Sequence, residues 1–194
     1  TIRTSAGEHR ASRAVVCAGA WVGRVLPGVV PNWVERQVQF WFRARRPEEF
    51  APGRAPIFIR KRGGRDLYGF PTLDGQTVKV AAHHGGAKAD PDRLDRQVHE
   101  ADRERVSDFV RDSIRGLDPD PVRSKVCMYT NSPDGDFVIG AVPGHSRLTV
   151  LGGMSGHGFK FATVMGEIAA DLATDGETRH PIEPFGPERF PTPD

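Results

Sequence analysis

The stretch LTVLGGMSGHGFK, residues 148–160, decides the fold because it joins contrasting local structures within a few residues. Its apolar start at 148–151 predicts a strand, the glycine-rich 152–158 predicts a tight turn, and 159–173 predicts a helix. The apolar residues of that helix recur at helical spacing, and Gly176 is placed to end it: Phe161, Val164, Met165, Ile168 and Leu172. This order of elements predicts a fold of the α+β class.

The glycine-rich turn has two readings. Glycines let a backbone approach a ligand closely, and a helix N-terminus favours an anion, so the turn could hold one. The order Gly153-x-x-Gly156-x-Gly158 differs from the dinucleotide fingerprint, however, and a purely structural turn explains it equally well. Lys160 is expected in the first turn of the helix, where a cation opposes the macrodipole. This position hints at an anionic partner, and a solvent-facing lysine is the plainer alternative.

Working outward, the sequence predicts a hairpin in which residues 1–4 pair with 14–18. A short helical stretch ends near 26–28. The middle of the chain predicts strands and a helix that covers their sheet. The strands are expected at 37–43, 57–60, 66–70 and 77–83, and further ones at 125–129 and 137–139. The helix carries an apolar stripe that Gly116 ends: Val106, Phe109, Val110, Ile114 and Leu117.

Strand alternation brings reactive side chains onto shared faces. Cys127 and Tyr129 share one face of their strand, and Lys79 and His83 share a face of theirs. Burial could tune both the lysine and the histidine, although a solvent-facing edge strand explains this pair more simply. A lone strand cysteine is usually a small buried hydrophobe, and Tyr68 alone would be a core residue.

Composition excludes several classes of protein. The 194 residues carry a formal net charge of +2, which is too small to favour nucleic acid or an acidic membrane surface. The sequence has no apolar run of the roughly 20 residues that cross a membrane, and no signal peptide is recognised. Cys17 and Cys127 lie far apart, the histidines are scattered, and no metal site is expected. We expect a cytoplasmic protein.

Two motifs, VCMYTNSPD at 126–134 and GMSGHGFK at 153–160, resemble a known family. The family is that of monomeric sarcosine oxidase and N-methyltryptophan oxidase, FAD-dependent amino acid oxidases of the D-amino acid oxidase superfamily. The spacing of the motifs fits it too, and the resemblance continues through VVCAGAW at 15–21, Arg36-Gln37, YGFP at 68–71 and VKV at 78–80.

The resemblance implies a domain organisation within a parent enzyme of α/β fold. Residues 1–36 would be part of an FAD-binding domain, and 37–125 a substrate domain with a mixed or antiparallel sheet covered by helices. Residues 126–180 would return to the FAD-binding domain with the flavin loop and its helix. Residues 181–194 would form an extended tail.

The resemblance also implies FAD as cofactor, held covalently by a thioether from Cys127 to the 8α-methyl carbon of the flavin. Lys79 matches a lysine above the flavin that promotes the reaction with O₂. The loop residues that match the flavin contact are expected to bind the cofactor with Lys160: Gly153, Met154, Ser155, Gly156, His157 and Gly158.

On the substrate side, Tyr68, His83 and Tyr129 match residues that line the pocket, and Lys160 matches a lysine that holds the substrate carboxylate. The implied reaction oxidises the C–N bond of a secondary amino acid to an imine, which hydrolyses, and O₂ becomes H₂O₂. Sarcosine, N-methyltryptophan, another N-methyl amino acid and a cyclic imino acid all remain possible substrates.

One departure from the family is severe. The sequence lacks the strand–Gly-x-Gly-x-x-Gly–helix unit that binds the ADP part of FAD, and the N-terminal arginine that pairs with the substrate carboxylate. We therefore expect the C-terminal part of a longer enzyme, inactive without its N-terminal half. The alternative is a non-catalytic module, derived from the oxidase fold, that binds a small molecule or a protein. A nucleic-acid module would rest only on arginine-rich loops that lack interleaved aromatic residues.

Overall fold

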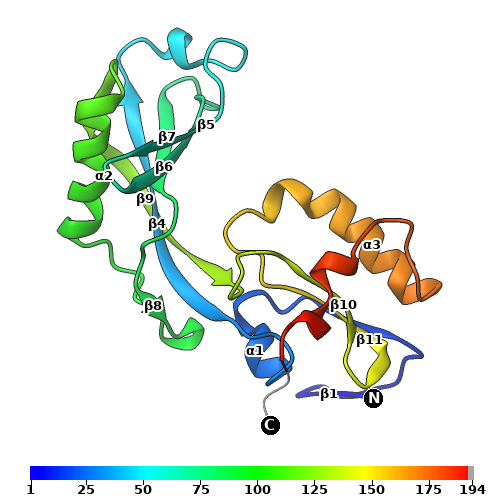
Figure 1. Cartoon of the computed structure of the whole chain (residues 1–194). Helices are drawn as coiled ribbons and strands as arrows, with labels where there is room; N and C mark the ends of the chain where they lie inside the picture. The colour runs from blue at the N-terminus through cyan, green and yellow to red at the C-terminus, as the bar shows by residue number, and fades with distance from the viewer. Residues whose placement is uncertain (192–194) are drawn as a thin grey trace. The chain divides into compact units, whose positions relative to one another are not determined.

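The computed structural model describes residues 1–191, without the side chains of residues 62 and 65. The chain forms two compact units, and Figure 1 draws both. Unit 1 combines Thr1–Val34 with the chain from Tyr129 onward, and unit 2 is the continuous segment Glu35–Met128. Within the described part, no helix is long and apolar enough to cross a membrane.

Unit 1 is built on a three-stranded sheet of order β10-β11-β3. Strands β10 (Val138–Val142) and β11 (His145–Gly152) form an antiparallel hairpin, and β3 (Ala14–Val16) runs parallel to β11. Alternation along the strands sends side chains to both faces. One face packs on helix α3 (Ala162–Thr174) through Ile139, Leu151, Met165 and Ile168; the other carries Val138, Val142 and Val150 against Val22 of α1 (Val22–Val25).

The expected hairpin between 1–4 and 14–18 is wrong. Strand β1 (Ile2–Thr4) pairs with β2 (Gly7–His9), because Gly7, at a φ of 127°, lets the chain reverse at once. Strand β3 pairs instead with β11, far along the chain. Local turn signals could not reveal that partner.

Unit 2 is a sheet of order β5-β6-β7-β4-β8, with β9 also pairing with β4. Its strands are β4 (Trp33–Ala44), β5 (Phe58–Arg62), β6 (Arg65–Phe70), β7 (Thr77–Ala82), β8 (Lys88–Ala89) and β9 (Leu117–Asn131). Helix α2 (Glu100–Ser113) covers one face, as Figure 1 shows. The core between them is apolar and almost fully buried: Phe40, Phe42, Leu67, Val78, Val80, Val106, Phe109 and Val110.

Helix α2 ends earlier than its apolar stripe suggests. Ile114 is already non-helical at φ −124° and ψ 91°, Gly116 takes a left-handed φ of 89°, and Leu117 begins β9. Leu117 still belongs to the core, with 4% of its surface exposed. Helical spacing therefore predicted its burial correctly and its secondary structure wrongly.

Short 3₁₀ helices complete the chain at Gly19–Trp21, Pro47–Phe50, Pro91–Arg93, Phe159–Phe161, Glu183–Phe185 and Pro187–Arg189. The last two show that the expected extended tail is partly wrong, because residues 183–189 are mostly helical turns. Ile182 and Phe185 pack against the α3 side of the unit 1 core. Residues 192–194 of that tail lie outside the described residues.

Candidate functional site

The candidate site in unit 2 lies on the sheet face opposite α2. Lys79 of β7 pairs across strands with Trp41 of β4 and with Phe70 of β6, while its neighbours Val78 and Val80 point into the core. Strand β7 therefore lies inside the sheet, between β6 and β4. The solvent-facing edge that could have explained Lys79 is excluded.

Three aromatic rings surround the Lys79 ammonium group. The Nζ atom lies 5.1 Å from the ring centre of Phe70, 5.6 Å from that of Tyr68 and 5.8 Å from that of Trp41. Rings at this range stabilise a cation, and burial opposes its charge. Burial prevails, and it lowers the pKa of Lys79, while the nearby Cys127 acts in the opposite direction. The guanidinium of Arg123 stacks on Trp41 at 4.1 Å.

Cys127 is half-buried on the same face, in β9. Its Sγ accepts a 3.5 Å hydrogen bond from Nε2 of Gln39, which also lies 3.5 Å from the Tyr68 hydroxyl. Burial raises the pKa of the Cys127 thiol, and Lys79, then Gln39, counteract that rise. A desolvated thiol beside a cation is a nucleophile whose reactivity its neighbours control.

His83 follows β7 and stacks edge-to-face with Tyr68, with ring centres 6.1 Å apart. The His83 ring also lies beside that of His84, with ring centres 4.3 Å apart. His84 has a left-handed φ of 63°, rare for a non-glycine residue, and its Nδ1 lies 3.3 Å from Oε2 of the buried Glu35. Glu35 also accepts hydrogen bonds from Gln37 and from the Gly86 amide, both at 2.7 Å. The carboxylate thus fixes the turn that follows His83.

The glycine loop in unit 1 is held by its own hydrogen bonds. Ser155 has a φ of 46°, and its amide donates to Thr130 at 2.9 Å. The Ser155 hydroxyl donates to the carbonyl of Gly153 at 3.0 Å and accepts from the Ser132 amide at 3.2 Å. These hydrogen bonds stabilise the conformation of the loop from within the protein.

Close packing explains why this loop needs its glycines. A Cβ at Gly156 would come within 2.5 Å of the Tyr129 ring, and one at Gly158 within 2.8 Å of Met154. At Gly153 it would meet Val138 at 2.9 Å, and Gly153 and Gly156 both have positive φ. The structural reading of these glycines is therefore sufficient, whether or not a ligand also approaches them.

Lys160 is not in the first turn of α3. It lies in the preceding 3₁₀ turn Phe159–Phe161, and its Nζ donates to the carbonyl of His157 at 3.2 Å. Because its ammonium group already donates to a backbone oxygen, its position is explained without an anion, and the role of Lys160 toward an anion stays a prediction. The His157 ring lies beside Phe137 with Nε2 3.0 Å from the Gly135 carbonyl.

The structure thus brings the predicted residues together in two sets. Unit 2 holds Lys79, Tyr68, His83 and Cys127 in one cluster. Unit 1 holds Tyr129, the loop 153–158 and Lys160. Sequence reasoning missed the neighbours Gln39, Trp41 and Glu35. Alternation along 37–43 puts Gln39 and Trp41 on one face of their strand, but only the register with β7 places them beside Lys79.

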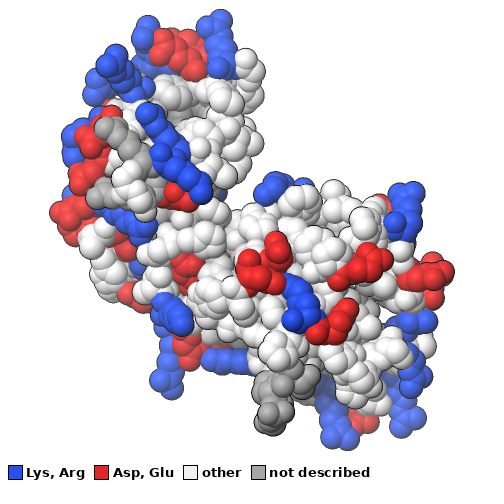
Figure 2. Space-filling view, viewed as in Figure 1, with Lys and Arg blue, Asp and Glu red and all other residues white. Residues whose placement is uncertain are grey.

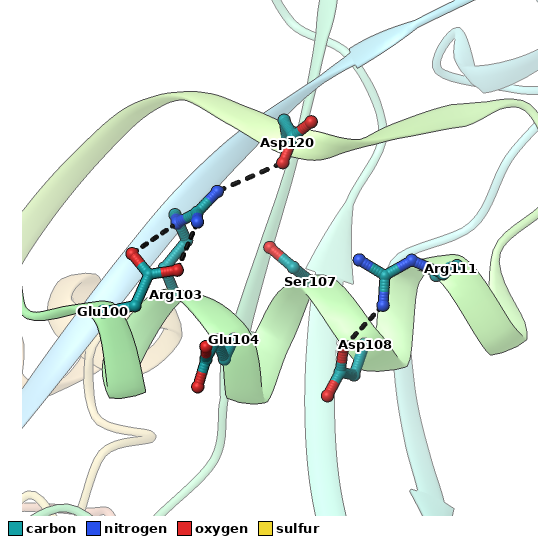
Figure 3. A pocket seen from close by; sticks show the side chains of 7 residues that line it. All are labelled: Glu100, Arg103, Glu104, Ser107, Asp108, Arg111 and Asp120. Atoms are coloured by element: carbon teal, nitrogen blue, oxygen red, sulfur yellow. Dashed lines mark hydrogen bonds and ion pairs between the residues drawn. The ribbon is translucent and has the colours of Figure 1, made fainter.

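A groove between α2 and β9 contains none of the predicted site residues. It encloses about 430 Å³ between α2 and β9, and Figure 3 shows its charged lining. The charges largely neutralise one another: Arg103 pairs with Glu100 and with Asp120, and Arg111 pairs with Asp108. Basic and acidic side chains are also interspersed on the surface shown in Figure 2, which does not favour nucleic acid.

Comparisons with known proteins agree on one family. Residues 1–172 match the DAO family, described as FAD dependent oxidoreductase. Monomeric sarcosine oxidase of Streptomyces avermitilis is 40% identical over 195 residues, 97% of this chain and 51% of that protein. N-methyl-L-tryptophan oxidase of Escherichia coli is 37% identical over 202 residues, 98% of this chain and 51% of that protein.

The fold agrees as well. The structure of NikD, an unusual amino acid oxidase essential for nikkomycin biosynthesis, superposes with a TM-score of 0.78 at 24% identity, over 95% of this chain and 50% of that one. The chain spans about half the length of the curated relatives it matches. By the match over residues 1–172, this chain belongs to the DAO family of FAD-dependent oxidoreductases.

Proposed function

We propose that this chain supplies the flavin-ring and substrate side of an oxidase that acts on the C–N bond of a secondary amino acid such as sarcosine. One observation carries the proposal. A lysine enclosed by aromatic rings and a half-buried cysteine share one sheet face with a tyrosine and a histidine. A pure scaffold does not need a half-buried cation among aromatic rings, because partial burial disfavours its charge.

The residues present fit the flavin ring of FAD. Aromatic side chains and a half-buried thiol suit a planar heterocycle, and Cys127 is the group we propose to bind it covalently. In that linkage the thiol and the flavin methyl group each lose one hydrogen, and O₂ accepts both to give H₂O₂. When bound, FAD would accept the two electrons that the amine loses.

Lys79 would provide positive charge where O₂ is reduced. Oxygen gains negative charge as it accepts electrons, and a fixed cation in a partly dehydrated setting stabilises that charge strongly. The depressed pKa of Lys79 reflects the burial that makes this effect large. Tyr68 and His83 would line the substrate side, and Glu35 would hold the turn that positions His83.

From unit 1 we propose Tyr129 as a further pocket residue, Lys160 as a partner of the substrate carboxylate, and 153–158 as the loop against the cofactor. The exposed Lys160 ammonium has to leave the His157 carbonyl to serve in this way, an exchange of one hydrogen bond for an ion pair. The overall reaction converts the amino acid, O₂ and water into an amine, an aldehyde and H₂O₂.

The same proposal predicts that these 194 residues do not turn over substrate alone. They contain no Gly-x-Gly-x-x-Gly motif, so the ADP part of FAD has no recognisable binding unit here. We propose that a nucleotide-binding half, joined to this chain or added to it, completes the enzyme.

The decisive test is made on the protein that includes such a half. After denaturation, yellow colour that stays with the polypeptide is expected, and Cys127→Ser should release all of it, whereas Cys17→Ser should release none. Covalent flavin that persists in Cys127→Ser would disprove the anchor. A protein that binds no flavin at all would instead support the alternative, a non-catalytic binding module derived from the oxidase fold.

A further inference from the structure

Two carboxylates and an imidazole meet at the C-terminal half of α3. Glu167 and Asp171 lie four residues apart, on one side of the helix. His180 follows the helix, on the segment drawn after α3 in Figure 1. One ligand atom from each of the three side chains lies within 4.8 Å of the others. We propose that Glu167, Asp171 and His180 bind a divalent transition metal ion of the zinc type.

The spacing of the donor atoms suits a single ion. Nε2 of His180 lies 3.3 Å from Oε1 of Glu167. Two ligands bound at about 2.0–2.1 Å in tetrahedral geometry stand roughly 3.3 Å apart. Ile182 and Phe185, just beyond His180, pack against Met165 and Ile168, so the core holds the histidine near the helix.

The His180 ring nitrogen faces the Glu167 carboxylate. Nε2 is buried from solvent and pairs with Oε1 of Glu167 at 3.3 Å, a contact that is longer than a well-formed hydrogen bond. Its lone pair, close to a carboxylate, is the arrangement from which imidazole binds zinc.

The surroundings of the carboxylates support the same assignment. The Thr178 hydroxyl donates to Oδ2 of Asp171 at 2.7 Å, which leaves Oδ1 for the ion and orients the carboxylate, as outer hydrogen bonds do in metal sites. Arg179 donates to the same Oε1 of Glu167 at 2.7 Å, and this exposed guanidinium would have to move aside for an ion to bind that oxygen. Two carboxylates and one guanidinium leave a net negative charge, which attracts a dication.

The ligand types favour nitrogen- and oxygen-binding metals such as Zn²⁺ over Mg²⁺ or Ca²⁺, which prefer oxygen alone. With three protein ligands, water would complete the coordination. The ion would fasten the segment after α3 to the helix. The sequence led us to expect no metal site, because its histidines are scattered and its two cysteines lie far apart. None of them belongs to the proposed flavin or substrate site, so the proposal stands independently of the proposed function.

The test is a calorimetric titration of the metal-stripped protein with ZnCl₂. We expect one high-affinity Zn²⁺ per chain, weakened about tenfold or more by each of His180→Gln, Glu167→Gln and Asp171→Asn. His145→Gln, in the exposed turn of the β10–β11 hairpin, is the matched control and should leave affinity unchanged.

Thermal unfolding gives a second measurement, since an ion that binds only the folded state raises Tm. Zn²⁺ should raise Tm in the parent protein and in His145→Gln, and not in His180→Gln. Circular dichroism of each apo variant checks that it folds, and Co²⁺ in place of Zn²⁺ reports the coordination through its visible spectrum. An absence of stoichiometric binding, or equal binding by His180→Gln and the parent protein, would overturn the site.

Discussion

The sheet face of unit 2 and the glycine loop of unit 1 were both expected to contact the flavin, yet they are built in opposite ways. The sheet face holds a half-buried lysine among aromatic rings, whose charge burial disfavours, and a half-buried thiol beside it. The loop is held by its own contacts, because the Ser155 hydroxyl bonds to the Gly153 carbonyl and its glycines admit neighbouring side chains. The case for function therefore rests more on the lysine of the sheet face than on the backbone of the loop.

Removing the charge from the sheet face should have the largest effect. In the complete enzyme, Lys79→Met is expected to slow the reaction of reduced flavin with O₂ by on the order of 10²- to 10³-fold, because a fixed charge in a dehydrated site is lost. Reduction by the amine should change far less. Stopped-flow measurement of both half-reactions decides the matter, with the exposed Lys61→Met as control. Equal slowing of both half-reactions would show that Lys79 has no specific role with O₂.

Adding one methyl group to the loop tests the claim that packing explains its glycines. Gly156→Ala forces a Cβ against the Tyr129 ring at a φ of 78°, whereas Gly144→Ala has a similar φ of 75° and open space around it. The backbone conformation alone costs about 1–2 kcal/mol, and the clash should bring Gly156→Ala to roughly 3–4 kcal/mol.

Urea unfolding of both glycine variants measures the difference in free energy. If Gly156→Ala lowers the free energy of unfolding no more than Gly144→Ala does, the Tyr129 ring moves aside at little cost. Close packing would then not explain why the loop has a glycine at position 156.

A variant of Gln39 tests how the sheet face controls the reactivity of Cys127. Gln39→Met keeps the length of the side chain and removes the donor to Cys127, so the pKa of the thiol should rise further. At pH 8, alkylation of Cys127 by iodoacetamide should slow roughly three- to tenfold, because less thiolate is present. The measurement is made in a Cys17→Ser background to leave one thiol. An unchanged alkylation rate would mean that the 3.5 Å hydrogen bond from Gln39 to Cys127 does not stabilise the thiolate.

The smallest effect is expected at an ion pair of unit 1. Arg189, with help from a backbone amide, lowers the pKa of Asp134 to about 2. The folded pKa lies below the unfolded value, so the pair stabilises the protein above about pH 4, and this contribution is lost as the pH falls through about 2.

Arg189→Met should abolish that part of the acid dependence at a cost of at most about 1 kcal/mol near neutral pH, since the Asp134 side chain is 37% exposed. Unfolding followed between pH 2 and pH 7 tests it. A variant with the same acid profile as the parent protein would show that Arg189 is not the cause.

Sequence alone located most strands and both long helices, since alternation and helical spacing are local properties. It misplaced Leu117, because a residue that starts a strand can keep the spacing of the helix before it. It expected Lys160 in the first turn of an α-helix, where the structure has a 3₁₀ turn that leads directly into α3. Gln39 and Trp41 went unnoticed because their neighbours come from strand register, which a single sequence does not specify. Glu35 went unnoticed because its partners His84 and Gly86 lie in a turn far along the chain. The roles of Cys127, Lys79 and the loop were inferred from resemblance, and they remain predictions.

The parallel pairing of β3 with β11 has a consequence for the order of events during synthesis. Unit 2 is continuous, so it can fold as soon as Met128 has left the ribosome. Strand β3 emerges before unit 2 but must wait for Leu148–Val150 before it gains its partner. Its apolar residues stay uncovered in the meantime, and chaperones that shield nascent chains should bind this segment during that interval.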